Sequence, residues 1–162
     1  NKAINKESGD ITEIIKSLKS IPQNIPIKNR LEIHGVLYDK DNRNHMKNTT
    51  ELIKPMEDPK IFRDLNFCAF HIFHCSINQF QAIQALKNIG FEVPENETTK
   101  YISEIEMYRK FWQEGKLFKT YPTSGIVLKI NSRKLQKLLG ENNVSINWAY
   151  TIKKCISQQT KK

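Results

Sequence analysis

Two short apolar runs near the C-terminal end, each leading to a lysine, constrain the fold most. Residues 126–130 form the first run, which contains Lys129, and residues 146–152 form the second, which Lys153 follows. Both runs have the length and the β-branched and aromatic content of a strand. We expect the two strands to deliver both lysines into one pocket, where a rigid backbone fixes the two cations around a phosphate.

Helices and strands alternate irregularly along the rest of the chain. Apolar spacing predicts helices over residues 11–21, 77–89, 99–113 and 132–139, and a shorter one over 59–65. We expect Asp10 to cap the first helix, Gly90 to end the second, and Thr98 or Thr99 to cap the third. Residues 30–39 and 67–73 are predicted strands, and residues 39–55 a polar loop. Several strand pairs lack a crossover helix, which favours a mixed α+β domain with antiparallel sheets over a doubly wound sheet.

Charge and composition limit the class of protein. The chain has 162 residues, enough for one domain, and a formal net charge of +9. Such a charge favours a polyanionic partner, above all a nucleic acid; the alternative is that coding bias simply over-uses Lys and Asn. No apolar run is long enough for a membrane span, and the first residues do not resemble a signal peptide. We expect a soluble intracellular protein, in the cytoplasm or associated with the nucleoid or nucleus.

The cysteines and histidines do not predict a metal site. The chain has three cysteines, an odd count without metal-ligand spacing, so reduced thiols are expected. His71 and His74 lie between Cys68 and Cys75, but strand alternation would put Cys68 on the face opposite His71. No second pair at zinc spacing exists. We therefore predict no protein-bound metal.

The C-terminal motifs resemble a known family. Gly125 to Asn131, then Leu139-Gly140, then Trp148-Ala149 and Lys153 match the pattern Asp-Gly-Val-Val-Ile-Lys-Val-Asn, Leu-Gly, Trp-Ala-x-x-x-Lys at the same spacings. Earlier pieces follow in the same order: Gly9 to Thr12 with Ile21-Pro22, Leu31 to Gly35, Leu65 to Ile72 and Ile89 to Val93. From about Ser8 to Lys154 the chain resembles the adenylation (nucleotidyltransferase) domain of the NAD-dependent DNA ligases.

The resemblance implies a chemistry and a set of site residues. In that family a lysine of a Lys-x-Asp-Gly motif attacks the adenylyl phosphorus of NAD, and AMP then passes to a DNA 5′-phosphate before the nick is sealed. Lys129 and Lys153 would neutralise the transferring phosphate, as compact ammonium charges can; the alternative is two solvated strand-end lysines. The resemblance implies that Phe70 stacks on adenine, the alternative being that it is a core aromatic residue. It implies that Val127 lies against the other face of the base. Lys116 and His34 stand where the family has arginines. Trp148 is interpreted as a packing residue. Mg²⁺ would arrive on substrate phosphates.

Several family features are altered. No Lys-x-Asp-Gly motif occurs in the sequence, and in the family it lies upstream of the segment that corresponds to Asn1. Val36 stands at the position of a strand glutamate and cannot hold a ribose hydroxyl or a metal-bound water. Ser124 replaces the aspartate that opens the late motif. The arginine-bearing Asn-Pro-Arg insert has no counterpart between Val36 and Leu65.

Two functions are therefore open. Residues 1–156 would be a partial adenylation domain without its nucleophile segment, with residues 157–162 as a polar basic tail. In the first hypothesis, the chain belongs to a split NAD-dependent DNA ligase system acting on nicked duplex DNA, and a second polypeptide carries the Lys-x-Asp-Gly segment. In the second, the chain is a catalytically inactive ligase-like protein that binds nucleic acid or a replication or repair partner. Whether the chain is an enzyme is left open by the sequence.

Overall fold

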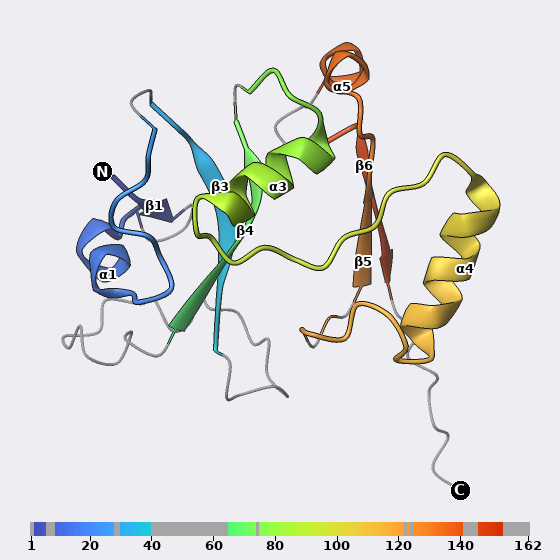
Figure 1. Cartoon of the computed structure of the whole chain (residues 1–162), viewed down its shortest axis with the longest axis horizontal. Helices are drawn as coiled ribbons and strands as arrows, with labels where there is room; N and C mark the ends of the chain where they lie inside the picture. The colour runs from blue at the N-terminus through green and yellow to red at the C-terminus, as the bar shows by residue number, and fades with distance from the viewer. Residues whose placement is uncertain are drawn as a thin grey trace, which may run out of the picture. The chain divides into compact units, whose positions relative to one another are not determined.

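The computed structural model describes residues 2–5, 9–27, 30–39, 65–73, 75–121, 123, 125–140 and 146–153 (Figure 1). The chain divides into two compact units, Asn1–Pro94 and Glu95–Lys162. Helices alternate with short antiparallel strand pairs in the described part, which is a mixed α+β arrangement as the sequence predicts. None of the helices in that part is long and apolar enough to cross a membrane.

The first unit contains two strand pairs and two helices. Its elements are β1 (Ile4–Asn5), β2 (Gly9–Asp10), α1 (Thr12–Ser17), β3 (Ile33–Asp39), β4 (Leu65–Ile72) and α3 (Gln79–Asn88). β1 pairs antiparallel with β2, and β3 pairs antiparallel with β4. The strands predicted at 30–39 and 67–73 are thus confirmed as β3 and β4, with starts shifted by three and two residues and the end of β4 by one.

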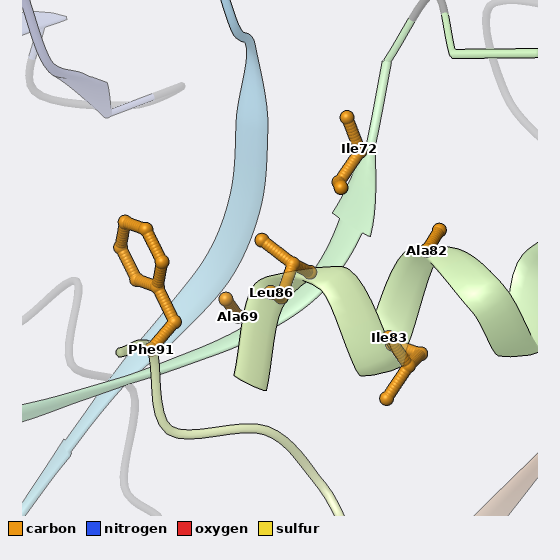
Figure 2. Close-up of a cluster of buried hydrophobic side chains, with 6 residues drawn as sticks. All are labelled: Ala69, Ile72, Ala82, Ile83, Leu86 and Phe91. Carbon is orange, nitrogen blue, oxygen red and sulfur yellow. The ribbon is translucent and has the colours of Figure 1, made fainter. Parts of the chain in front are cut away.

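Helix α3 lies across the β3–β4 pair and packs on β4 (Figure 1). The buried cluster between them consists of Ala69, Ile72, Ala82, Ile83, Leu86 and Phe91 (Figure 2). A second cluster joins α1 to the same strand pair through Ile11, Leu18, Leu37 and Leu65. Both clusters use one face of the sheet. We call the other face the distal face; by register it carries His34, Val36 and Tyr38 of β3 and Asn66, Cys68 and His71 of β4.

Helix α3 has a complete set of end signals. The Asn78 side chain accepts from the N–H of Gln81, and the Gln81 side chain accepts from the N–H of Asn78, which is a capping box. At the other end Gly90 has φ 96°, and the Phe91 N–H donates to Leu86 O while the Gly90 N–H donates to Lys87 O. These two bonds form a Schellman motif, for which a glycine at positive φ is suited. The stop at Gly90 is as predicted.

The β3–β4 register contains one irregularity. His34 pairs with His71, but the next residue, Gly35, pairs with Ala69, so the ladder passes over Phe70. Phe70 is therefore the extra residue of a β-bulge. The bulge reverses the alternation along β4, so that Ala69 and Ile72 both face α3.

The second unit contains α4 (Ile102–Gln113), β5 (Gly125–Lys129), α5 (Arg133–Leu139) and β6 (Ala149–Lys153). β5 and β6 form an antiparallel pair, which confirms the two C-terminal strands. α5 begins after Ser132, whose hydroxyl accepts from the Leu135 N–H, and ends at Gly140, as predicted. Its buried Gln136 donates to Ile130 O at 2.5 Å and so ties the helix to the end of β5.

The structure corrects three details of the predicted helices. α1 ends at Ser17, before Pro22, and its N-cap is Ile11; Asp10 lies in β2, although its carboxylate accepts from the Thr12 N–H at 2.9 Å. Likewise Thr99 precedes the N-cap of α4, Tyr101, and its hydroxyl accepts from the Tyr101 N–H. Four sequence predictions concern residues outside the described part: the loop 39–55 beyond Asp39, the helix 59–65 before Leu65, Ser124 and the tail 157–162.

Candidate functional site

The paired strands β5 and β6 place both motif lysines on one face. Lys129 lies opposite Ala149, and Lys153 lies opposite Gly125, with Val127 opposite Thr151 between them. Residues directly opposite in an antiparallel pair project to the same side. The lysines stand at opposite ends of this row, four residues apart along the ladder, which corresponds to about 13 Å. Val127, at the centre, is 53% exposed.

The two lysines differ in their surroundings. Lys153 is exposed, whereas Lys129 is half-buried. Burial lowers the pKa of the Lys129 ammonium from its ordinary 10.5 to about 8. An anion beside Lys129 would favour its charged form and raise that pKa again. The face can therefore hold an extended anion between one partly desolvated cation and one solvated cation.

The packing role inferred for Trp148 is confirmed. Trp148 is buried, and its carbonyl accepts from the Ile130 N–H at 2.9 Å, which extends the β5–β6 pairing by one step. The close approach of the two strands at the start of β5 needs a glycine: a Cβ on Gly125 would meet Ile152 O at 2.7 Å.

Phe70 lies at the bulge of β4, half-buried and outside both core clusters. The buried Gln79, the first residue of α3, donates from Nε2 to Phe70 O at 3.3 Å. Bulges are frequent beside binding sites because they re-aim a side chain. No local sequence pattern predicts this bulge or the role of Gln79.

His34 belongs to an aromatic cluster at the end of β3. Its ring lies 4.1 Å from the ring of Phe73 and 6.4 Å from that of His71, centroid to centroid. Its Nε2 lies 3.3 Å from Glu32 Oε1. The ring is thus in contact with aromatic neighbours and a carboxylate, on the distal face that also carries Val36.

Val36 is 38% exposed on the distal face. The neighbouring Gly35 is required by packing, because a Cβ there would lie 2.3 Å from Phe67 Cζ and 2.6 Å from Cys68 O. The strand therefore keeps its glycine for steric reasons, while the side chain at position 36 has no polar atom to offer.

Lys116 follows the C-terminal end of α4. Its N–H donates to Phe111 O and the Gly115 N–H donates to Trp112 O, so α4 also ends in a Schellman motif. The Lys116 ammonium lies 2.7 Å from Glu114 Oε2, and the hydrogen bond from Lys116 holds the pKa of that carboxyl below its ordinary value. Both side chains face solvent, where such a pair contributes little to stability.

One sequence argument about metal ligands was wrong. Because the bulge at Phe70 reverses the alternation, Cys68 and His71 lie on the same face, not on opposite faces. Within the described residues no three His, Cys, Asp or Glu side chains are grouped so that they could hold a metal ion. His74 lies outside those residues.

The structure thus gathers the predicted site residues in two groups, one in each unit. Lys129, Lys153 and Val127 share a face of the β5–β6 pair, and Lys116 lies elsewhere in the same unit. Phe70 and His34 lie on the β3–β4 pair. Sequence reasoning missed a further polar pair in the first unit, in which the Tyr38 hydroxyl donates to Glu92 Oε1 at 2.5 Å.

In this mixed α+β protein, the β5–β6 pair of the second unit presents two lysines on one face, which is a candidate phosphate-binding site. The family of the NAD-dependent DNA ligase adenylation domain matches residues 5–154. The chain belongs to this family.

Individual relatives agree with the family match. A DNA ligase of Prochlorococcus marinus (strain NATL2A) is 32% identical over 182 residues, covering 91% of this chain and 26% of that protein. DNA ligases of Mesoplasma florum and Thermotoga neapolitana are each 28% identical over 170 residues, covering 91% of this chain and 26% and 24% of theirs. The chain therefore spans about a quarter of the length of these relatives.

Proposed function

We propose that the chain supplies the downstream half of an adenylation domain in an NAD-dependent DNA ligase system that seals nicks during replication and repair. The observation that carries this proposal is the β5–β6 ladder, which sets Lys129 and Lys153 on one face with Val127 between them. Membership of the adenylation-domain family supports it. Ammonium groups that the strands already hold on one face can neutralise phosphate charge with little reorganisation.

The other site residues have separate tasks in this proposal. In the first unit, Phe70 stacks on adenine and His34 contacts a phosphate oxygen. In the second unit, Val127 lies against a face of the base and Lys116 contacts a phosphate oxygen. Residues 1–156 then form part of a nucleotidyltransferase fold, and residues 157–162 form a basic tail. The half-buried, bulged position of Phe70 supports the stacking role, because its side chain is left out of the core beneath α3.

NAD is the cofactor that this site would hold, and when bound it supplies the adenylyl group. Each unit fits a part of a nucleotide, because the first offers an aromatic side chain for a base and the second offers lysines suited to phosphate. Mg²⁺ would be carried by the substrate phosphates. The nucleophilic lysine would come from a Lys-x-Asp-Gly segment outside this sequence, on an upstream segment or a second polypeptide, and nicked duplex DNA, in the nucleoid or nucleus, would be the final acceptor.

A second candidate function is that of an inactive ligase-like protein that binds nucleic acid or a partner protein. The exposed Val36 favours it, since a valine on the distal face offers no hydrogen bond to a ribose or to a metal-bound water. In this case Lys129 and Lys153 contact nucleic-acid phosphates without supporting transfer.

A chimera separates the two functions. Residues 5–154 replace the matched region in the DNA ligase of Prochlorococcus marinus, and sealing of a nicked duplex is measured. We expect sealing, and a loss of about a hundredfold on Lys129→Ala, because a preorganised charge is removed from the transfer step. Lys137→Ala, an exposed lysine on α5, is the matched control and should leave the rate unchanged.

Two outcomes of the chimera experiment would contradict the proposal. If the chimera seals only after Val36→Glu, the inactive function is favoured. If neither form seals and both still bind DNA, the assignment of the site to adenylyl transfer fails. For the unmodified chain incubated with NAD and Mg²⁺, intact-mass measurement should show no covalent AMP; a gain of one AMP would show that the nucleophile is already present.

A further inference from the structure

Helix α5 exposes its apolar side and buries a polar side chain. Leu138 is 74% exposed, and Leu135 and Leu139 are 48% and 44% exposed. Residues three and four apart lie on one face of a helix, so the three leucines form a single apolar face. Neither buried cluster of the described residues includes them. Contiguous apolar surface that stays exposed in this way often marks an interaction site.

The buried side of α5 is held in place without these leucines. Gln136 is 2% exposed, and its Nε2 donates to Ile130 O while its Oε1 accepts from Arg133 Nη1. At the C-terminal end of the helix, Asn147 Nδ2 donates to Leu139 O at 2.9 Å. These hydrogen bonds fix α5 at one end of the β5–β6 pair (Figure 1). Polar contacts therefore set the orientation in which the leucines face outward.

A fourth exposed apolar residue lies beside the end of α5. The Asn147 N–H donates to Gly140 O at 3.3 Å, which brings the preceding residue, Ile146, close to the end of the helix. Ile146 is 43% exposed. We call this group the α5 apolar patch, and it consists of Leu135, Leu138, Leu139 and Ile146.

The charge around the α5 apolar patch is positive. Residues 115–162 carry ten of the 26 lysines and arginines of the chain but one of its 17 acidic residues, Glu141. The helix α5 and the strands β5 and β6 contain no acidic residue. Lys134 is exposed and lies four residues before Leu138, at the edge of the leucine face. Such a surface is complementary to an acidic partner that also carries apolar side chains.

Other occupants match the α5 apolar patch less well. A second copy of the chain would bring two positive surfaces together, and like charges across an interface oppose association. A nucleic acid would attract the lysines, but leucine side chains offer no hydrogen bond to a phosphate or a base. The helix has 7 residues, or about two turns, which is short for a helix that lies on a membrane surface.

We propose that the α5 apolar patch docks an acidic amphipathic helix of a partner protein. Apolar side chains of that helix pack on Leu135, Leu138 and Leu139, and its carboxylates face Lys134. Recognition of a helix through apolar anchors at i, i+3, i+4 and i+7 is a recurrent mode of partner binding. This inference goes beyond the proposed function, because it uses none of the residues assigned to base or phosphate and holds whether or not the chain takes part in adenylyl transfer.

The test titrates the full chain with a synthetic peptide. The probe is a helical peptide of about 14 residues, or about four turns, with leucines at i, i+3, i+4 and i+7 and glutamates beside them. We expect saturable binding by fluorescence anisotropy with a dissociation constant below about 1 mM. A second peptide with lysines in place of the glutamates should bind at least about tenfold more weakly, because it meets like charges.

Matched variants at exposed positions locate the contact. Leu138→Gln should weaken binding of the glutamate peptide about tenfold, since it removes an apolar side chain from the interface. Ile102→Gln makes a comparable change at an 81% exposed position of α4 and should leave binding unchanged. Lys134→Gln should weaken binding about threefold at low salt. Lys137→Gln, two residues from Leu135 and so on the opposite side of the helix, should change it by less than about twofold.

Three results with the peptides would overturn the inference. If the lysine peptide binds as tightly as the glutamate peptide, the charge argument fails. If Leu138→Gln and Ile102→Gln have the same effect, the peptide does not bind at the α5 apolar patch. If the glutamate peptide does not bind at about 1 mM, the partner chemistry is wrong.

The same measurements identify a different occupant. If the unmodified chain self-associates in sedimentation equilibrium and Leu138→Gln makes it monomeric, a second copy covers the patch and the inference fails. If nicked duplex DNA or anionic vesicles displace the glutamate peptide from the unmodified chain, the patch belongs to a nucleic-acid or membrane contact and the inference also fails. Sealing by the chimera depends on none of these results, so failure of the inference is distinguishable from failure of the proposed function.

Discussion

Lys129 and Lys153 end neighbouring strands, yet only their tertiary surroundings make them different. Lys153 is exposed, whereas burial lowers the pKa of Lys129 to about 8. At pH 7 the Lys129 ammonium is still charged in the folded chain, but it carries a desolvation cost that a bound phosphate would offset. Lys129, whose charged form burial disfavours, is thus the better candidate for binding a phosphate.

Lys129 should make stability depend on pH in a defined direction. The unfolded chain keeps this proton up to about pH 10.5, and the native chain loses it near pH 8. Between these values the unfolded state binds more protons, so the free energy of unfolding rises with pH. Lys129→Met should therefore stabilise the chain at pH 7, by on the order of 2 kcal/mol, and the gain should shrink as pH rises toward 10.5.

Urea unfolding at pH 7 and at pH 9.5, followed by tryptophan fluorescence, measures this effect. The exposed Lys153→Met is the matched control and should change stability by less than about 0.5 kcal/mol at either pH. A gain for Lys129→Met that is the same at both pH values would contradict the desolvation argument.

At the scale of elements, the bulge in β4 decides what the strand presents. In a strand without the bulge, alternation from Cys68 would place Phe70 on the distal face and His71 toward α3. With the bulge, His71 lies on the distal face with Cys68, and Ile72 lies in the core. The contact from the buried Gln79 to Phe70 O joins this bulge to the first turn of α3. The helix that covers one face of the sheet thereby fixes the irregularity that shapes the other.

Replacing Gln79 should loosen the bulge without unwinding α3. Gln79→Leu removes the donor to the Phe70 carbonyl, and we expect a loss of about 1 kcal/mol with faster amide exchange in β4 around Phe70. Asn78→Ala, one residue earlier, removes the capping box and should cost a similar amount while accelerating exchange in the first turn of α3. Hydrogen exchange resolved by residue distinguishes them; identical patterns for both variants would contradict a specific role for Gln79.

At the scale of the whole molecule, the net charge and the buried hydrophobic clusters are distributed differently along the chain. The net charge of +9 belongs to the chain as a whole, whereas both clusters of buried hydrophobic residues found in the described part lie in the first unit. The second unit presents lysines and exposed apolar side chains on a two-stranded ribbon and two helices. Two-stranded ribbons are marginal on their own.

Binding to nicked duplex DNA should be strongly salt-dependent. Each phosphate contact that a lysine makes releases condensed counterions, so the logarithm of affinity falls linearly with the logarithm of salt concentration. Lys153→Ala should reduce the slope by about one, and Glu97→Gln, a substitution at an exposed acidic position, should not reduce it. Affinity that stays flat from low to moderate salt would contradict the nucleic-acid role.

Local signals account for the elements that the sequence predicts well. Gly90 and Gly140 end α3 and α5 as expected, because a glycine at positive φ is a short-range requirement. The strands β3 to β6 follow from runs of apolar residues. Asp10 and Thr99 were misassigned as N-caps by one or two residues, since several side chains near a helix start can accept from the backbone.

By itself the sequence determined the family, the order of strands and helices, and the two motif lysines, because all of these are written in residue types at fixed spacings. Tertiary structure decided the antiparallel register that sets Lys129 and Lys153 on one face, the burial that lowers the pKa of Lys129, and the bulge at Phe70. It also decided the contact between Tyr38 and Glu92, which are 54 residues apart. Register, desolvation and long-range hydrogen bonds depend on which segments meet in space, and no local pattern encodes that.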